Sequence, residues 1–319
     1  MEIVVLDAYS FNPGDIDWEP IARYGRLTVY DQTERAQAAE RLKDADVAFT
    51  NRVRLGEAEF SAAPKLRFLG LLATGYDKID MAAARRHNVV VSNVPGYATE
   101  AVAQHAVALM LTLCNSARLF DEQVRKGRWT QKPGGCEWDY PIVGVGGKVF
   151  GVLGTGAIGC ATAKMAQGLG MRVIGSSRTV RKEFVGKYVP QDELLRRSDV
   201  LSLHCAANAQ TAGLIDRIAI EKMKKSAILI NTARGALVDT RALVDALNSG
   251  RLFAAGLDVA EEEPIGSGDP LLSAKNCIVT PHIGWASLSV REELMRLSAE
   301  NLKAFLDGAP VHRVDLEGA

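Results

Sequence analysis

The chain contains 319 residues, of which 47% are hydrophobic and 24% are charged, and its 38 Lys and Arg residues balance 38 Asp and Glu residues. This length is sufficient for two domains, and a net charge near zero excludes a global electrostatic attraction to nucleic acid or to an anionic membrane surface. No apolar run approaches the length of a bilayer span, and residues 1–5 read as a strand instead of a charged signal region. We therefore expect a cytoplasmic protein with no nucleic-acid or membrane partner.

The cysteines are dispersed along the chain without any CxxC pair. This spacing argues against a structural zinc site and against a disulfide framework, and it suits a reducing compartment. We expect no metal, and we expect small buried thiols at Cys114, Cys136, Cys160, Cys205 and Cys277.

The first hundred residues alternate between strand-like and helix-like segments. Helical spacing of apolar residues marks 33–43 and 80–87 as helices. Apolar or β-branched runs predict strands at 1–7, 27–30, 47–51, 68–73 and 89–93. This alternation predicts a parallel sheet with helices on both faces.

Residues 99–119 read as one long helix with few charges in its middle, and Thr99 is a plausible N-cap. A helix that is apolar on most sides must be buried between domains or subunits. The following stretch, 125–147, is rich in Gly, Trp and Pro and is predicted to be a loop arm that carries Trp129 and Trp138.

A glycine-rich turn at 154–159, with the sequence GTGAIG, opens a second alternating unit. An apolar run at 149–153 precedes it, and a helical segment at 157–169 and a strand at 172–176 follow it. This context is typical of a dinucleotide-binding fingerprint, in which the helix N-terminus meets a pyrophosphate. Further strands are predicted at 200–204, 227–231, 254–259 and 277–280, and further helices at 192–198, 216–224, 240–249 and 287–306.

Three polar side chains fall just beyond predicted strands of this second unit: Arg234, Glu263 and His282. An arginine supplies a planar fork of donors for a carboxylate, and an imidazolium can protonate a carbonyl oxygen as hydride arrives. A carboxylate beside the imidazole favours its protonated form and fixes its tautomer. Taken singly, each residue also has a structural alternative: Arg234 fits a surface arginine, Glu263 part of a solvated acidic loop and His282 a core histidine.

Five ordered segments carry a resemblance to a known family. They are residues 93–106 (NVPGYATEAVAQHA), 154–159 (GTGAIG), 229–239 (LINTARGALVD), 255–264 (AGLDVAEEEP) and 280–287 (TPHIGWAS). Together they resemble the D-isomer-specific 2-hydroxyacid dehydrogenase family, and most of all its glycerate dehydrogenase and glyoxylate-hydroxypyruvate reductase branch. The resemblance covers essentially the whole chain.

The resemblance implies an α/β fold with two doubly wound parallel-sheet domains. A flavodoxin-like substrate-binding domain would comprise residues 1–98 and 288–319, and a Rossmann dinucleotide-binding domain would comprise 99–287. Within the latter, 99–147 would supply a dimerisation helix and arm, so a homodimer is expected.

The resemblance also implies a role for particular side chains. Arg234 would bind the substrate, His282 would be the acid/base and Glu263 its partner. The substrate carboxylate would bind the backbone of Ala73, Thr74 and Gly75, with Arg234, His282 and Trp285 as further substrate contacts. The cofactor contacts would be Gly154, Thr155, Gly156, Ala157, Ile158, Gly159, Cys205, Thr211, Thr232, Ala233 and Asp258, the last accepting from the nicotinamide carboxamide.

The second strand of the dinucleotide unit ends in Ser177, Arg178 and Thr179, where many members of the family carry an acidic residue. A carboxylate repels a 2′-phosphate, whereas a hydroxyl and a guanidinium receive it. We therefore predict that NADP(H) is preferred and that NAD(H) is possible; a solvent-facing Arg178 is the alternative.

Other positions depart from the family pattern or have more than one interpretation. Ala157 removes one possible pyrophosphate contact, and Ala206 replaces a usual proline and is expected to loosen a loop near the cofactor. Arg52 is as plausible on the surface as at the substrate. Trp138 and Trp285 are candidates for walls of a small substrate pocket, whereas the remaining histidines are interpreted as structural or surface residues: His87, His105 and His312.

The sequence thus predicts an NAD(P)H-dependent oxidoreductase that reduces a small 2-oxo acid, glyoxylate or hydroxypyruvate, to glycolate or D-glycerate. A dehydrogenase for another 2-hydroxy acid is the alternative within the same class. A non-catalytic, dinucleotide-sensing scaffold of the corepressor type is the alternative from another class.

Overall fold

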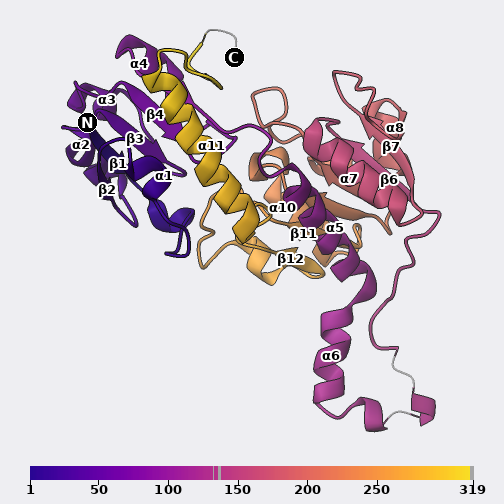
Figure 1. Cartoon of the computed structure of the whole chain (residues 1–319). Coiled ribbons are helices and arrows are strands. Elements are labelled where there is room, and N and C mark those ends of the chain that lie inside the picture. Colours follow the sequence, from indigo (N-terminus) through magenta and orange to yellow (C-terminus); the bar gives the residue numbers. More distant parts are fainter. Residues whose placement is uncertain (132, 136–137, 317–319) are drawn as a thin grey trace. The chain divides into compact units, whose positions relative to one another are not determined.

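The computed structural model describes residues 1–131, 133–135 and 138–316. The chain separates into two compact units, one made of Met1–Ala98 with the chain from Ala286 onward, and one of Thr99–Trp285 (Figure 1). Each unit contains its own parallel sheet and its own hydrophobic core.

The first unit is built on a five-stranded parallel sheet in the order β2-β1-β3-β4-β5. Its strands are β1 (Glu2–Val5), β2 (Arg26–Val29), β3 (Val47–Thr50), β4 (Phe68–Leu71) and β5 (Val90–Ser92). Its helices are α1 (Glu19–Ala22), α2 (Arg35–Leu42), α3 (Glu57–Ala62), α4 (Met81–Arg86) and α11 (Leu288–Leu306). The strand order 2-1-3-4-5 is the flavodoxin-like order, which confirms the predicted fold class for this unit.

The second unit contains a seven-stranded parallel sheet in the order β12-β11-β10-β9-β6-β7-β8. Its strands are β6 (Val149–Leu153), β7 (Arg172–Ser176), β8 (Lys187–Tyr188), β9 (Val200–Leu203), β10 (Ile228–Asn231), β11 (Ala254–Leu257) and β12 (Cys277–Val279). Counted from β6, the order is 3-2-1-4-5-6 with one more strand, which is the Rossmann arrangement. The six predicted strands are present, and the two-residue β8 is added at the edge beside β7.

Helices of the second unit follow the glycine turn and the later strands. They are α5 (Thr99–Asn115), α6 (Ala117–Arg125), α7 (Ala157–Gly168), α8 (Gln191–Arg197), α9 (Arg217–Lys222) and α10 (Thr240–Asn248). Short 3-10 helices lie at Ala8–Ser10, Trp129–Gln131, Pro133–Gly135, Gly235–Leu237 and Pro270–Ser273. α5 packs against α7, β10 and β11, so its apolar face forms part of the core of its own unit.

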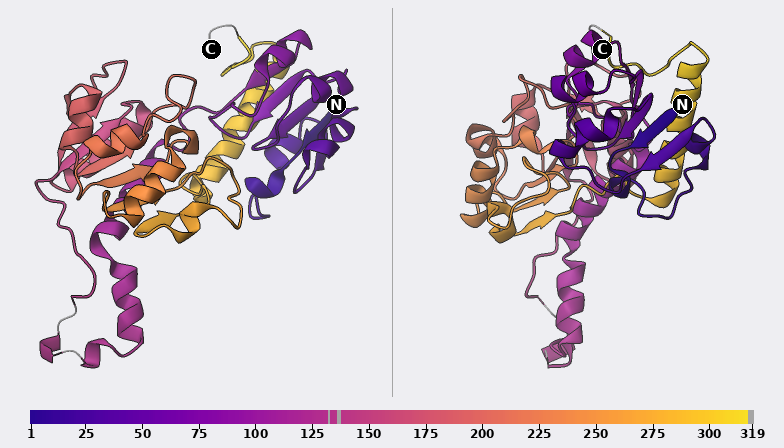
Figure 2. Two further views of the ribbon diagram at one scale, coloured as in Figure 1. Left: turned by 180° about the vertical axis from the view of Figure 1, so that it is seen from behind. Right: turned by 90° about the vertical axis from the view of Figure 1, so that its left-hand side faces the viewer.

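The single helix predicted for 99–119 is wrong, because the chain breaks at Ser116. This residue has a left-handed conformation, with φ of 49°, and separates α5 from α6. Its hydroxyl donates to the carbonyl oxygen of Pro141 at 3.1 Å, and the N–H of Val143 donates to the carbonyl of Cys114 at 2.8 Å. The break lets α6 and the following arm project from the body of the second unit (Figure 2).

The described thiols are unpaired, at Cys114, Cys160, Cys205 and Cys277, whereas Cys136 lies outside the described residues. Cys114 and Cys160 are buried as predicted, but Cys205 and Cys277 are only partly buried, since Cys205 lies in the loop after β9 and Cys277 opens β12, an edge strand. Across the described part of the chain, no helix combines the length and the apolarity needed to cross a bilayer. The same residues contain no cluster of three or more potential metal ligands.

Candidate active site

The glycine turn between β6 and α7 has the form that a bound pyrophosphate requires. Gly154 has φ of +97°, and a Cβ there would lie 2.6 Å from the backbone nitrogen of Cys205. A Cβ at Gly159 would overlap the carbonyl oxygen of Gly154, so α7 packs directly on the turn. At Gly156, the N-cap of α7, no described heavy atom comes within 4 Å of the Cβ position. The N-terminus of α7 is therefore open to an anion, and the residues present fit a dinucleotide.

The loop after β7 holds the exposed residues Ser177, Arg178 and Thr179. The guanidinium of Arg178 donates to Gln210 Oε1 at 3.4 Å, which orients it across the neighbouring loop. The hydroxyl of Tyr188, on β8, accepts from the N–H of Arg181 at 2.8 Å and is hydrogen-bonded to the hydroxyl of Thr155 at 2.8 Å. Tyr188, which the sequence did not single out, thus ties this loop to the glycine turn.

The loop after β9 lies against the glycine turn at Cys205. Burial raises the pKa of the Cys205 thiol. His204 Nε2 is hydrogen-bonded to Ser202 Oγ at 2.8 Å, its buried Nδ1 has no hydrogen-bond partner among the described residues, and burial lowers the pKa of this histidine to about 4. Thr211 Oγ1 donates to the carbonyl of Ala206 at 2.7 Å and accepts from the N–H of Asn208 at 2.8 Å. The threonine therefore closes the loop at the position where proline is missing.

Arg234 follows β10 on a turn that the Asn231 side chain builds. Asn231 Oδ1 accepts from the N–H of Ala233 at 3.0 Å, and Asn231 Nδ2 donates to the carbonyl of Arg234 at 2.8 Å. A Cβ at Gly235 would overlap the backbone of Ala260, so this turn packs against the loop that follows β11. Thr232 and Ala233 occupy the same turn, and Thr232 is buried with its hydroxyl lacking a hydrogen-bond partner among the described residues.

His282 and Glu263 form a direct pair. His282 Nδ1 lies 2.6 Å from Glu263 Oε2, and the exposed fractions of the two side chains are 27% and 24%. Glu263 Oε1 also accepts from the N–H of Ala260 at 3.2 Å, which fixes the carboxylate. Since an ionised carboxylate only accepts, Nδ1 carries a hydrogen, and Nε2 is the nitrogen left to exchange a proton with a substrate.

Asp258 lies directly beyond β11 and is 2% exposed. Its carboxylate accepts from Thr280 Oγ1 at 2.6 Å and from the N–H groups of Ile283 at 2.9 Å and Gly284 at 2.8 Å. Burial by itself raises the pKa of Asp258, but hydrogen bonds from His105, Thr280 and the two amides outweigh it and lower that pKa. Asp258 therefore holds the loop that carries His282; its predicted contact with a carboxamide stays a prediction.

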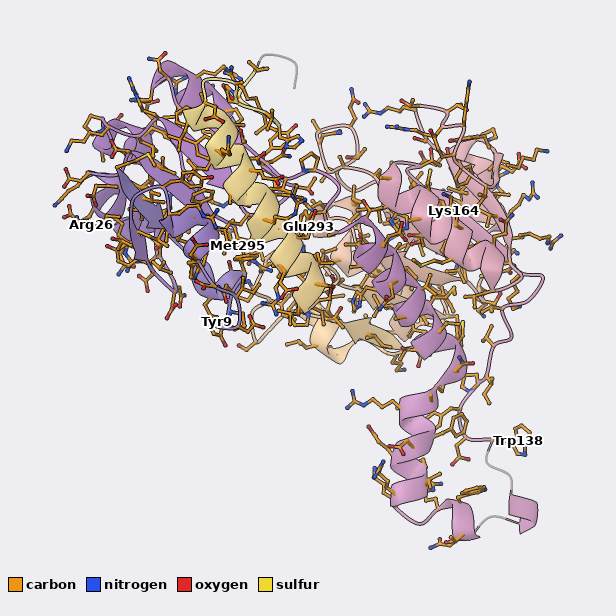
Figure 3. The ribbon with its side chains drawn as sticks, in the orientation of Figure 1. Tyr9, Arg26, Trp138, Lys164, Glu293 and Met295 are labelled. Carbon is orange, nitrogen blue, oxygen red and sulfur yellow. The ribbon has the colours of Figure 1, made fainter. Side chains whose placement is uncertain are left out.

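Because β10, β11 and β12 are neighbours in one parallel sheet, their carboxyl ends share an edge. The structure thus brings the Arg234 turn, the Glu263 loop and His282 to the same edge of the second unit. Trp285, close to His282 in sequence, is 8% exposed. Trp138, labelled in Figure 3, lies in the arm and is 79% exposed.

The predicted carboxylate-binding segment lies beyond β4 in the first unit. Val94 N–H donates to the carbonyl of Ala73 at 3.0 Å, Thr74 Oγ1 donates to the carbonyl of Val94 at 2.8 Å, and Asn93 Nδ2 donates to the carbonyl of Thr74 at 2.6 Å. These bonds fix the segment that ends in Gly75. Arg52 follows β3 closely in the sequence, and its backbone N–H donates to Asp7 Oδ2 at 2.6 Å.

The three other histidines differ from one another. His87 Nε2 pairs with Glu57 at 2.7 Å on the surface, and His312 Nδ1 lies 2.9 Å from Asn301 Oδ1, as expected of surface and structural residues. The interpretation of His105 was incomplete, because its Nε2 lies 3.0 Å from Thr280 Oγ1 and 3.3 Å from Asp258 Oδ1. Its partners are more than 150 residues away along the chain, so helical spacing alone gave no signal for this contact.

Two doubly wound sheets, one with a dinucleotide turn and an Arg, Glu and His at adjacent strand ends, define a nicotinamide-dependent oxidoreductase. Residues 107–284 match the D-isomer specific 2-hydroxyacid dehydrogenase, NAD binding domain family. A hydroxypyruvate reductase of Blautia hydrogenotrophica is 43% identical over 321 residues, covering 99% of this chain and 100% of the relative. The chain therefore belongs to the D-isomer-specific 2-hydroxyacid dehydrogenase family.

Two further similarities are to a glyoxylate reductase and to a solved reductase structure. A glyoxylate reductase of Korarchaeum cryptofilum is 39% identical over 278 residues, covering 84% of this chain and 82% of the relative. The solved structure of an acyclic imino acid reductase in complex with NADPH and D-Arg superposes with a TM-score of 0.87 at 29% identity, covering 98% of this chain and 100% of that one.

Proposed function

We propose that the enzyme reduces a small 2-oxo acid, glyoxylate or hydroxypyruvate, to glycolate or D-glycerate. The observation that carries the chemistry is the His282–Glu263 pair, with Nδ1 and Oε2 2.6 Å apart, at the sheet edge that also presents Arg234. The relatives named as hydroxypyruvate reductase and glyoxylate reductase support the choice of substrate.

In this mechanism, the Arg234 guanidinium binds the substrate carboxylate and orients the carbonyl. The reduced nicotinamide, when bound, supplies the hydride. His282 donates the Nε2 proton to the carbonyl oxygen as negative charge develops there, and Glu263 stabilises the imidazolium before transfer. The carbonyl thus gains one hydride and one proton and becomes the hydroxyl. In the reverse direction His282 accepts the proton.

Dinucleotide binding by this unit rests on the glycine turn and on the residues around it. The pyrophosphate would meet Gly154–Gly159 at the N-terminus of α7, including the backbone of Thr155, Ala157 and Ile158. Further contacts would come from Cys205 and Thr211 in the loop after β9, from Thr232 and Ala233 after β10, and from Asp258 after β11.

We further propose that NADP(H) is preferred over NAD(H). Ser177, Arg178 and Thr179 are exposed and follow β7, and they offer two hydroxyls and a guanidinium instead of a carboxylate. Arg178→Ala should lower kcat/KM for NADPH by roughly 10- to 100-fold, the value of hydrogen bonds to a charged group, and change that for NADH little. Arg172→Ala, at the opposite end of β7, is the matched control. A wild-type preference for NADH would overturn this proposal.

A homodimer formed through α5 and the arm is also proposed. Apolar side chains are exposed on α6 and the arm, with exposed fractions of 41% at Leu119, 46% at Val124, 52% at Trp129 and 59% at Ile142. Val124→Asp should convert a dimer to a monomer in light scattering, whereas Ile218→Asp, at an even more exposed position on α9, should not. A wild-type monomer would refute the proposal.

The unpaired thiols suit a reducing compartment, and the cytoplasm is the proposed location.

The decisive test of function is a steady-state screen of glyoxylate, hydroxypyruvate, pyruvate and bulkier 2-oxo acids with NADPH and with NADH. One arm adds an amine, because a similar solved structure is an imino acid reductase. His282→Ala should lower kcat strongly and leave cofactor binding nearly unchanged, and Arg234→Ala should raise KM for the oxo acid as well as lower kcat. Near-normal turnover in both variants would show that the catalytic assignment is wrong. Cofactor binding without reduction of any 2-oxo acid would instead favour a dinucleotide-sensing scaffold.

A further inference from the structure

The loop that carries His282 is fastened on both sides of that residue to one buried carboxylate. Thr280 precedes His282 and donates its hydroxyl to Asp258 Oδ1, and Ile283 and Gly284 follow it and donate their backbone N–H groups to the two oxygens of Asp258. His282 itself has φ of 57°, a left-handed conformation that costs a non-glycine residue roughly 1–2 kcal/mol. The surrounding hydrogen bonds must therefore hold His282 in place.

His105, on α5, is attached to this carboxylate in two ways. Its Nε2 lies 3.0 Å from Thr280 Oγ1 and 3.3 Å from Asp258 Oδ1, and its side chain is 19% exposed. Because Thr280 directs its single hydroxyl proton to Asp258, it can only accept from His105. His105 Nε2 therefore carries a hydrogen, and the bonds run in one direction from His105 through Thr280 to Asp258.

The packing around this chain of bonds leaves little room for adjustment. A Cβ at Gly284 would lie 2.9 Å from Asp258 Oδ2 and 3.3 Å from Cδ2 of His105. The loop therefore rests directly on both side chains, and a change in either one shifts the backbone immediately after His282. Asp258 is itself fixed from the other side, since its N–H donates to the carbonyl of Asn231 at 2.9 Å.

We propose that His105 is a positioning residue for the reaction: through Thr280 and Asp258 it holds the loop of His282 so that the imidazole stays on Glu263. The inference rests on the proposed function, in which His282 exchanges the proton. His105 is not one of the residues proposed to contact the substrate, and it acts from a helix that the sequence analysis assigned to packing and dimerisation. Its loss alters the placement of a catalytic group, and a misplacement of about 1 Å can reduce a rate roughly 100-fold.

The test compares His105→Leu, which removes the donor at similar volume, with His105→Gln, which keeps an N–H donor on a side chain of similar reach. We expect His105→Leu to lower kcat roughly 10- to 100-fold. The dissociation constant of the reduced cofactor, measured by fluorescence, should change much less than kcat, because the contacts at the glycine turn are untouched. His105→Gln should recover most of kcat. His87→Leu, at a surface histidine of the other unit, is the matched control and should leave kcat unchanged.

Thr280→Val removes the intermediate hydroxyl at nearly constant shape, and it should reproduce the loss of kcat even if His105→Leu does not fold. Unchanged kcat in both variants, with His282→Ala inactive in the same assay, would overturn the inference and leave the proposed function intact. An equal loss in the Leu and Gln variants would also overturn it. If the wild type reduced no 2-oxo acid, the proposed function would fail separately. In that case a crystal structure of His105→Leu still tests the positioning role. An unchanged His282–Glu263 contact contradicts this role, and a displaced His282 supports it.

Discussion

Acidification should destabilise the protein through His204, and the size of the effect follows from its burial. Burial lowers the pKa of His204 to about 4 from an ordinary value of 6.5. The unfolded chain therefore binds more protons than the folded one between these two values. Stability is retained above pH 6.5 and is lost as the pH falls from about 6.5 toward about 4.

The shift amounts to about 2.5 pKa units, and at 1.36 kcal/mol per unit it is worth at most about 3 kcal/mol. Between pH 7 and pH 4.5 the loss attributable to this residue is about 2 kcal/mol. His204→Gln is the reference variant, because glutamine does not titrate and can place a polar atom near Ser202 Oγ, where Nε2 now lies. All other titrating groups are common to both proteins, so they cancel in the difference.

The assay is urea unfolding followed by tryptophan fluorescence at pH 7 and pH 4.5. Trp285, which is 8% exposed, belongs to the second unit with His204, and its exposure on unfolding reports on that unit, whereas Trp129 and Trp138 are already exposed. The wild type should lose about 2 kcal/mol more than His204→Gln between the two pH values. Identical losses in the two proteins would refute the argument that the imidazole is buried in its neutral form.

Glu263→Gln should lower kcat roughly 10- to 100-fold, because an amide cannot stabilise the imidazolium of His282; kcat near the wild-type value would contradict the pairing of the two side chains. Gly159→Ala should destabilise the second unit by about 1–3 kcal/mol and weaken binding of the reduced cofactor, because the added Cβ overlaps the Gly154 carbonyl oxygen. Gly168→Ala, in the same helix, adds a Cβ in open space and is the control that should be tolerated. Thermal melting and cofactor titration measure both effects. Cys277, whose pKa burial raises to about 12, should resist iodoacetamide at pH 8 until urea unfolds the protein, and peptide mass spectrometry showing rapid labelling would disprove this.

The repeating units of the fold could be predicted because the central parallel strands are buried on both faces and therefore appear as apolar runs. The six predicted strands of the second unit are all present. β8 was missed because two residues at a sheet edge, Lys187 and Tyr188, leave no run to detect. The break at Ser116 was missed because no glycine or proline marks it; it coincides with hydrogen bonds from Ser116 to Pro141 and from Val143 to Cys114, which are distant in sequence.

The residues of the candidate site also divide into those that could be predicted from the sequence and those that only the structure reveals. Arg234, Glu263 and His282 could be located because they follow strands within a few residues, strand ends of a parallel sheet meet at one edge, and all three lie in the family-like segments 229–239, 255–264 and 280–287. His105 could not, because it lies in the middle of an apolar helix, and only the packing of α5 on β11 brings it to Asp258. Long-range packing of this kind has no periodic signature in the sequence.

Tyr188 links two parts of the dinucleotide unit that are usually considered separately. Its hydroxyl bonds both Thr155 in the glycine turn and the N–H of Arg181 beyond the Ser177–Thr179 segment. Attempts to alter nucleotide preference by exchanging residues 177–181 therefore also act on the glycine turn that is proposed to bind the pyrophosphate. Exchanges that retain Tyr188 and the spacing to Arg181 should change selectivity with little loss of affinity. Those that disturb either one should weaken the binding of both nucleotides together.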